Sequence, residues 1–364
     1  MSLLAIFGSF QASFWYSALV THPQISYNTL TMPRGERPPI HEMEPSSFLS
    51  LEHWIEHDFQ RQYEILAKIM AKTGDLELLP DVGEMGILGM DGREYPIPSM
   101  EGLVREMTKT PERKERIETK MKQGFTNLDL TPFASPIERL MATTERVIRK
   151  HHADGKLFAT RKNPSDGNEP LMPLELDTTK PLFVWDKLIH ADVNGELQYF
   201  VKQFDKTNHG GKTKQQLLDE AIRTGAPFPG WDVSLQESSI NIPRQGKGQT
   251  IGGRKQLETS QTPTEYLRTL LTDPNYRDES GTTIEQWLTK LKNTLERTHQ
   301  VIDDYSGSGS LNYLIAQYHP ASGYVPRGCW FRGSRQAYVD RDDPEIRDDY
   351  DGVRPAVRFS RLGV

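Results

Sequence analysis

The feature that most constrains this chain is its last segment, where an aromatic and arginine-rich stretch leads through acidic residues to a strand-like ending. The stretch runs Arg327-Gly-Cys-Trp-Phe-Arg-Gly-Ser-Arg-Gln-Ala-Tyr-Val-Asp-Arg341, and the ending is Gly352-Val-Arg-Pro-Ala-Val-Arg-Phe359. No lysine follows Lys292, so every later cation is an arginine, which suits planar, forked and stacked contacts. The segment carries no recognisable nucleophile, base or metal cluster, and its side chains are those of binding surfaces.

Composition narrows the classes of function. A chain of 364 residues with 36% hydrophobic content has room for a real core and for two structural units. The net charge of −6 argues against a general nucleic-acid binder, because no long basic stripe offsets it. The only cysteine is Cys329, which excludes an intramolecular disulfide.

Residues 1–45 are predicted to be an apolar N-terminal segment followed by a loop punctuated by proline and glycine. The first twenty residues lack the basic start of a signal peptide, and Gln11 with several serines weakens a membrane span. Membrane association is therefore not expected. Oligomeric state and cellular location stay open.

Residues 46–165 are predicted to be mainly helical. Apolar residues follow helical spacing in three stretches, at about 46–72, 100–122 and 136–150, and Thr110-Pro111 is expected to break the second. A hairpin is expected around Asp91-Gly92, and residues 154–173 have the composition of a linker.

The second half mixes short strands with helices, so the fold class is predicted to be α+β. Two strands, at 182–185 and 197–201, are expected to flank the turn at Asn194-Gly195. A helix is predicted from about residue 213 to Gly225. Thr262 with Glu265 forms a capping box before a second helix, and Thr282 with Glu285 repeats the pattern before a third.

Several short motifs have both a chemical and a structural interpretation. His53, Glu56 and His57 match H-x-x-E-H, which can hold zinc on a helix face, but no third ligand is evident and a polar helix face explains the motif. The phosphate-loop interpretation of residues 210–213 fails, because Lys206 stands where the first glycine is required. Two acidic clusters could bind calcium, although a variable surface explains them as well; they consist of Asp340, Asp342, Asp343, Asp348, Asp349 and Asp351.

The C-terminal segment resembles the C-terminus of the C-type lectin fold in its formylglycine-generating-enzyme subgroup. Within that group it is most similar to the variable proteins of diversity-generating retroelements, of the type found in candidate-phyla bacteria. The same resemblance is seen in further segments, and it covers residues 170–364. These segments are 181–186, 208–214, 230–231, 242–257 and 318–324. The resemblance implies a C-type lectin-like variable domain over 170–364, with Val353 to Phe359 as a central strand.

The resemblance also implies a function. In such systems errors at template adenines diversify AAY codons, and the resulting codons cannot encode Lys, Glu, Gln, Met or Trp. Between Gly328 and Asp351 only Trp330, Gln336 and Glu345 fall outside that set, so they are expected to be scaffold. The chain is thus expected to be a ligand-binding protein, not an enzyme, without a cofactor or a bound metal, and with a protein or other macromolecule as its partner.

The residues of the implied site form two groups. The variable, ligand-binding group is Cys329, Phe331, Gly333, Ser334, Tyr338, Val339, Asp340, Asp342, Asp343, Ile346, Asp348, Asp349 and Tyr350. The scaffold is Trp330, Arg335, Ala337, Gly352, Val353, Arg354, Ala356 and Val357. Two alternatives remain open: a mononuclear metal-dependent enzyme of the formylglycine-generating or ergothioneine-synthase-like group that uses His53 and His57, and a structural or assembly subunit.

Overall fold

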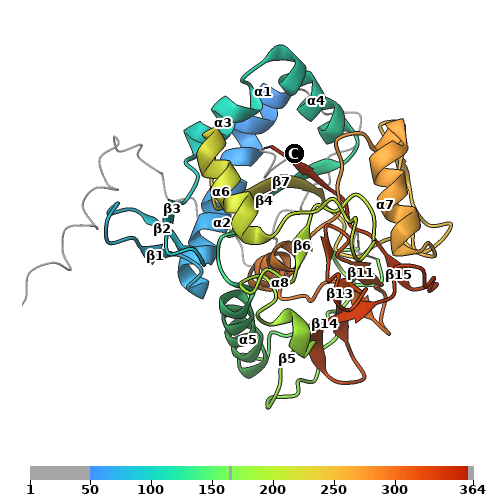
Figure 1. Cartoon of the computed structure of the whole chain (residues 1–364). Coiled ribbons are helices and arrows are strands. Elements are labelled where there is room, and N and C mark those ends of the chain that lie inside the picture. The colour runs from blue at the N-terminus through green and yellow to red at the C-terminus, as the bar shows by residue number, and fades with distance from the viewer. Residues whose placement is uncertain (1–49, 164–165, 360–364) are drawn as a thin grey trace, which may run out of the picture. The chain divides into compact units, whose positions relative to one another are not determined.

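The computed structural model describes residues 50–163 and 166–359, which belong to one compact unit (Figure 1). Helices and sheets alternate through this unit, so the chain is an α+β protein, as predicted. The predicted N-terminal segment, residues 1–45, lies outside the described residues.

Helix formation in the first part of the unit follows local signals. The three predicted helical stretches are present, and the second is interrupted before Thr110, whose side chain caps the helix beginning at Pro111. The hairpin around Asp91-Gly92 is also present, between β2 and β3. The elements are α1 (Leu51–Trp54), η2 (Ile55–Phe59), α2 (Gln60–Thr73), β1 (Glu77–Leu78), β2 (Met85–Leu88), β3 (Glu94–Pro96), α3 (Met100–Met107), α4 (Pro111–Lys122), β4 (Phe125–Thr131) and α5 (Ile137–Ala153).

The second part contains the remaining helices and most of the strands. Its helical elements are η3 (Asp186–Leu188), α6 (Lys214–Thr224), α7 (Pro263–Thr272), η4 (Pro274–Tyr276) and α8 (Ile284–Thr298). Its strands are β5 (Leu182–Val184), β6 (Gln198–Tyr199), β7 (Asp232–Glu237), β8 (Thr250–Ile251), β9 (Arg254–Lys255), β10 (Asp304–Tyr305), β11 (Leu311–Tyr313), β12 (Gln317–Tyr318), β13 (Val325–Phe331), β14 (Gln336–Asp342), β15 (Asp351–Gly352) and β16 (Ala356–Arg358).

The capping boxes of this part are partly as predicted. Thr262 and Glu265 form the expected box at α7. At α8 the box is one residue later than predicted, with Thr283 as the cap. The physical reason is that Glu285 is fully buried and its carboxylate is already bound by Lys214, at 2.8 Å.

The largest sheet has the strand order β15-β11-β13-β14-β5, and β10 pairs with β13 at one end. The hairpin of β13 and β14 forms its centre, with Cys329 opposite Tyr338 and Trp330 opposite Ala337. One face of this sheet packs on α8. The contact is close: a β-carbon at Gly328 would lie 2.6 Å from the ring of Trp287.

A second sheet, in the order β16-β7-β4, links the two parts of the unit. The predicted central strand over Val353 to Phe359 is wrong, because only Ala356–Arg358 is a strand and it lies at the edge of this small sheet. Pro355 explains the short length, since it has no N–H to donate to a ladder. Because β4 comes from the first part and β7 from the second, both predicted regions contribute to one core.

The two strands predicted around Asn194-Gly195 do not pair with each other. β5 lies parallel to β14 in the large sheet, whereas β6 pairs with β12. The segment with linker composition also packs on the unit, because Leu157 and Ala159 are buried and Phe158 forms a bridge with Gln300.

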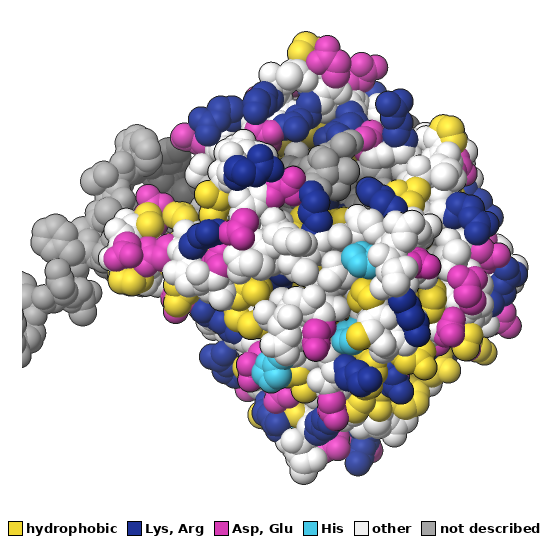
Figure 2. All heavy atoms as spheres, viewed as in Figure 1, with side chains coloured by type: hydrophobic (Ala, Val, Ile, Leu, Met, Phe, Trp, Pro, Cys, Tyr) yellow, Lys and Arg dark blue, Asp and Glu magenta, His cyan; other side chains and the backbone are white. Residues whose placement is uncertain are grey.

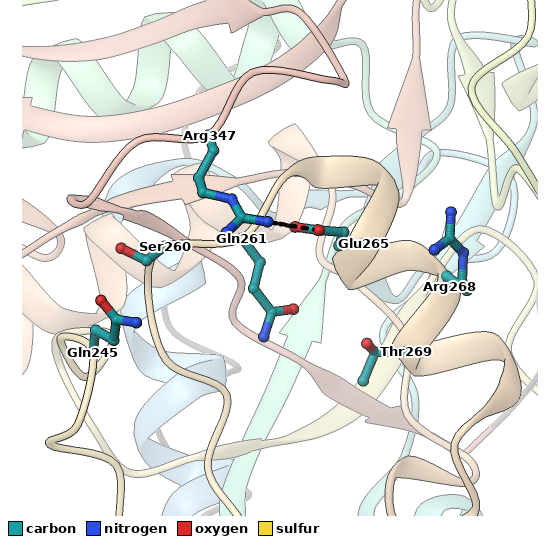
Figure 3. A pocket seen from close by; sticks show the side chains of 7 residues that line it. All are labelled: Gln245, Ser260, Gln261, Glu265, Arg268, Thr269 and Arg347. Carbon is teal, nitrogen blue, oxygen red and sulfur yellow. Dashed lines mark hydrogen bonds and ion pairs between the residues drawn. The ribbon is translucent and has the colours of Figure 1, made fainter.

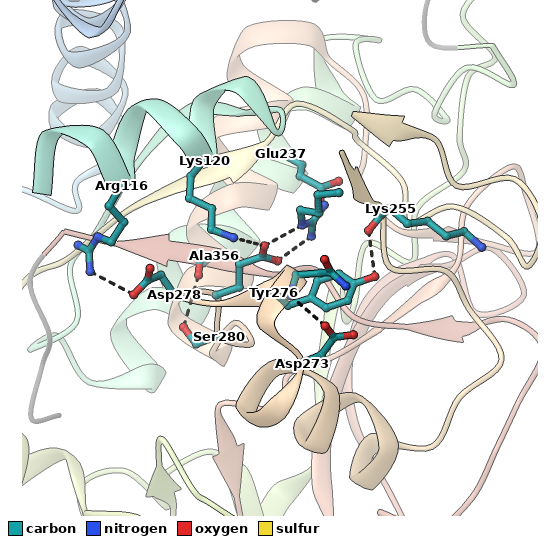
Figure 4. Close-up of polar contacts among 12 residues, drawn as sticks. Arg116, Lys120, Glu237, Lys255, Asp273, Tyr276, Asp278, Ser280 and Ala356 are labelled. Atoms are coloured by element: carbon teal, nitrogen blue, oxygen red, sulfur yellow. Dashed lines mark hydrogen bonds and ion pairs between the residues drawn. The ribbon is translucent and has the colours of Figure 1, made fainter. Parts of the chain in front are cut away.

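A buried ionic cluster fastens α4 to the second part of the unit. The Arg254 guanidinium binds Glu279 at 2.7 Å and Glu237 at 2.8 Å, and Lys120 binds Glu279 at 2.7 Å. Figure 4 shows Lys120 extending from α4 into this cluster, beside Glu237. Breaking such a buried group by removing one partner is costly, since the remaining charges stay buried.

Candidate ligand-binding face

The large sheet has two faces that differ in character. Side chains alternate along each strand, so Arg327, Cys329 and Phe331 of β13 point away from α8. Their partners on β14, Asp340, Tyr338 and Gln336, lie on the same side. We call this side the outer face. The opposite, inner face is apolar and packs on α8.

Five aromatic rings form a continuous row on the outer face and the adjoining loop. Phe183 stacks on Tyr338, with ring centroids 4.4 Å apart, and Tyr338 meets Phe331 at 5.6 Å. The row continues from Phe331 to Tyr305 at 5.6 Å and from Tyr305 to Tyr350 at 5.8 Å. We call these five residues the aromatic row. Amphipathic rings of this kind give large contact areas at low entropic cost.

A cation lies over each end of the aromatic row. The Nζ of Lys180 is 4.5 Å from the ring centroid of Phe183, and the guanidinium of Arg244 is 4.0 Å from that of Tyr350. Tyr350 remains 47% exposed. Figure 2 shows hydrophobic side chains gathered at the lower right, over the region of β13 and β14 in Figure 1.

Beside the aromatic row, Arg327 gathers three carboxylates. Its guanidinium lies 2.7 Å from Asp342, 3.1 Å from Asp351 and 3.9 Å from Asp340. The Tyr313 hydroxyl donates to Asp342 over 3.4 Å. We call these five residues the Arg327 cluster. Burial raises the pKa of Asp351 to about 6 and also raises that of Asp342, and Arg327 opposes both shifts.

The loop after β14 is exposed but held in place. Its own turns are closed by Asp343, which accepts from the backbone of Glu345, and by Asp348, which accepts from Tyr350. Two contacts tie it to the start of α7: Ser260 donates to Asp349, and Arg347 binds Glu265 at 2.7 Å. The loop therefore presents exposed side chains on a fixed backbone.

A polar pocket lies between this loop and α7. Its volume is about 440 Å³, and the Arg347–Glu265 pair crosses it (Figure 3). The residues that line it are Gln245, Ser260, Gln261, Glu265, Arg268, Thr269 and Arg347. The sequence reasoning did not identify this pocket, because its two sides come from distant segments.

Most residues of the predicted variable group are at least partly exposed. Those on the sheet and its hairpin turn that are exposed or half-buried are Phe331, Gly333, Ser334, Tyr338, Asp340 and Asp342. Those exposed on the loop are Asp343, Ile346, Asp348, Asp349 and Tyr350. The expected exposure is wrong for two members: Cys329 is 2% exposed and Val339 is 0% exposed. Val339 points to the inner face, whereas Cys329 is on the outer face but covered. Burial raises the pKa of the Cys329 thiol well above its ordinary value, which favours the protonated thiol near neutral pH.

The predicted scaffold is buried with one exception. Trp330 is 1% exposed, and Arg354 binds Asp303 at 2.8 Å and two backbone carbonyls. Arg335 contradicts the prediction: it is exposed and lies in the β13–β14 turn with φ 57°, where the side chain points to solvent. The other buried members are Ala337, Gly352, Val353, Ala356 and Val357.

The remaining sequence motifs concern metal ligands. The rings of His53, in α1, and His57, in η2, lie 4.2 Å apart, and both side chains are at least partly exposed. Across residues 50–163 and 166–359, no group of three or more His, Cys, Asp or Glu side chains is arranged to hold a metal ion. No helix in the same ranges is long and apolar enough to cross a membrane.

Sequence reasoning missed several residues of the outer face, among them Phe183, Tyr305, Tyr313 and Arg327. The alternation of Arg327, Cys329 and Phe331 was a usable signal, but the partner strands come from far away in the chain. Comparison with known proteins adds no further guide: no protein-family model, curated protein or solved structure matches this chain.

Proposed function

We propose that this chain is a ligand-binding protein whose outer face and adjoining loop form a variable surface, diversified by a retroelement that mutates adenines in its C-terminal coding region. The observation that supports this most directly is the separation of roles in one segment. Between residues 328 and 359, most loop residues are exposed and most outward-facing strand residues are half-buried, whereas Trp330, Ala337 and Arg354 are buried.

Physical reasoning favours binding over catalysis on this surface. The aromatic row supplies contact area, and the Arg327 cluster supplies acceptors whose positions are fixed by a shared cation. Substitution of exposed residues usually changes the free energy of unfolding by less than about 0.5 kcal/mol, so many side-chain combinations are compatible with one fold. The residues outside the adenine-derived codon set fit a scaffold, since Trp330 and Gln336 are buried and Glu345 binds Thr264.

The ligand is proposed to be a protein or another macromolecule. The flat sheet face and its loop offer an extended surface rather than an enclosed cavity. Its carboxylates favour a partner with basic or hydrogen-bonding groups, and they disfavour nucleic acid, whose phosphates they would repel.

Two matched libraries test the proposal. The first randomises Phe331, Tyr338, Asp340, Asp348 and Tyr350; the second randomises five buried residues, Trp330, Ala337, Val339, Val353 and Val357. The first library is expected to keep most members folded and to yield binders to basic protein targets on selection. The second is expected to lose folded members. Equal loss of folding in the two libraries would refute a variable surface.

The genetic part of the proposal has its own test. Deep sequencing of the coding region in a natural population should show substitutions confined to codons that carry adenines in a nearby template copy. An even spread of substitutions over residues 182–359 would refute the retroelement mechanism. That result would not exclude ligand binding by the outer face, which the two libraries test separately.

A further inference from the structure

A second pocket lies between α8 and the small sheet, away from the outer face. The helix face formed by Gln286, Lys290, Asn293 and Arg297 lies over the polar face of the small sheet, where Gln286 donates to Ser234 and Lys290 donates to Gln236. At one end of this polar layer is a pocket of about 240 Å³, which corresponds to roughly eight water molecules. Lys290, Asn293, Arg297, Asn127, Asp129 and Gln236 contribute to its lining.

Lys290 is half-buried in the wall of this pocket and differs from the buried lysines of the chain. Lys120, Lys214 and Lys292 are buried, and each is directly paired with a carboxylate, of Glu279, Asp192 and Asp75 respectively. The Nζ of Lys290 instead donates to the neutral amide oxygen of Gln236, at 2.9 Å. Within the described ranges, Lys290 has no carboxylate at ion-pair distance. Lys290 is only partly buried, and the neutral amide that holds its ammonium group does not compensate the charge.

The charges around Lys290 favour its neutral form. Burial is the largest cause, and the nearby Arg354 adds to it, so the pKa of Lys290 falls to about 7. Arg297 acts in the same direction, while Asp129 and Asp303 oppose it. Burial raises the pKa of Asp129 to about 6, so this carboxyl group can exchange a proton near neutral pH. Desolvation next to another cation is a known way to make a lysine nucleophilic.

We propose that this pocket binds a small aldehyde or keto acid and that Lys290 is the nucleophile, forming an imine with its carbonyl carbon. The lone pair on Nζ forms the C–N bond, and the carbonyl π electrons move to oxygen. Asp129 carries two protons in turn from nitrogen to oxygen: the first transfer gives a neutral carbinolamine, and the second accompanies cleavage of the C–O bond, so that water leaves. The nitrogen lone pair then completes the C=N bond. The overall change is amine plus carbonyl to imine plus water, and it needs no oxidant or reductant.

Arg297 suggests that the carbonyl compound carries an anionic group. Arg297 lies two turns after Lys290 on α8, lines the same pocket and is exposed at the surface. A guanidinium in this position can pair with a carboxylate while the carbonyl carbon faces Lys290. The proposal does not rest on the ligand-binding face, since that face lies on the side of the large sheet that points away from α8.

The test is reductive trapping on the full chain. The protein is incubated with glyoxylate and cyanoborohydride at pH 7, and modified lysines are located by peptide mass spectrometry. The unprotonated fraction at pH 7 of an amine with a pKa near 7 exceeds that of an ordinary lysine on the order of a thousandfold. Lys290 is therefore expected to be modified at least about tenfold faster than exposed Lys122, and its rate should level off above pH 8.

Four controls keep the proposal falsifiable. Denaturation in urea should abolish the selectivity, and Asp129→Asn should slow trapping at Lys290 without changing it at Lys122. Propionaldehyde, which lacks the carboxylate, should lose part of the preference for Lys290, and Arg297→Gln should remove the difference between the two aldehydes. If Lys290 in the folded wild-type protein reacts no faster than Lys122 with either aldehyde, the proposal is refuted, whatever the variants do.

Discussion

The clearest physical test of the two-faced sheet is to truncate an aromatic residue on each side and compare the free energies of unfolding. Trp330 is on the inner face and is 1% exposed, whereas Tyr350 at the end of the aromatic row is 47% exposed. Both substitutions to alanine remove a large ring from the same segment. They should differ in stability because only one ring is in the core.

The expected magnitudes follow from burial. A fully buried Trp removes roughly 200 Å² from water, which at about 25 cal/mol per Å² corresponds to about 5 kcal/mol as an upper value. Measured Trp→Ala changes in cores are about 3–5 kcal/mol, and we expect Trp330→Ala in that range. Tyr350 loses one edge contact with Tyr305 and the stacking of Arg244, so Tyr350→Ala should cost about 1 kcal/mol.

The assay is urea unfolding of the full chain, followed by far-UV circular dichroism and by tryptophan fluorescence. The midpoint gives the change in stability as long as the slope m stays constant. Tyr338→Ala serves as an intermediate case, because its ring is half-buried between Phe183 and Phe331. If Tyr350→Ala and Tyr338→Ala destabilise the chain as much as Trp330→Ala, the outer face is part of the core, and a variable surface has no physical basis.

Three further predictions concern the frame of the fold. Asp351→Asn removes a carboxylate whose folded pKa is raised to about 6. Because a raised acid pKa lowers stability as pH rises from about 4 to 6, the variant should gain about 2 kcal/mol relative to wild type between pH 4 and pH 8 in unfolding titrations, and an equal difference at both pH values would contradict the raised pKa. Gly328→Ala places a β-carbon 2.6 Å from the ring of Trp287 and should cost about 1–3 kcal/mol, seen as a lower Tm; an unchanged Tm would show that the sheet and α8 are not in close contact. Arg254→Met leaves buried carboxylates without their shared cation and should cost about 3–5 kcal/mol by urea unfolding, so a neutral result would contradict the buried ionic cluster.

The helices could be predicted from local signals in the sequence. The strand pairing could not, because it depends on residues that are far apart in the chain. A capping threonine such as Thr262 acts within one turn, so its effect can be read from neighbouring residues. At Thr283 the same reasoning was wrong by one residue, because distant Lys214 binds Glu285. Strand partners are harder still: the sequence around Leu182 does not reveal that β5 pairs with β14 near the other end of the chain.

The candidate site shows the same limit at the level of single side chains. Alternation along β13 assigns Cys329 and Phe331 to one face, but it does not reveal that neighbouring side chains cover the small Cys329 and leave Phe331 half-exposed. Exposure depends on the size of the neighbours and on which strands lie alongside. The predicted exposure of Val339 was wrong for a simpler reason. Val339 is one residue out of phase with Tyr338 and Asp340 along β14, and it therefore faces the core.

The Arg327 cluster explains how a surface of charged residues could vary without damage to the sheet beneath it. Arg327 is held by three carboxylates, of which Asp351 is fully buried and Asp340 and Asp342 are nearer to solvent. Because the buried partner remains when either outer aspartate changes, the guanidinium never loses all of its pairing in a single step. A buried charge left without any partner is what makes such substitutions severe. Sharing one cation among three acids therefore separates the part of the network that supports the strands from the part that is nearer to solvent, where the proposed ligand would bind.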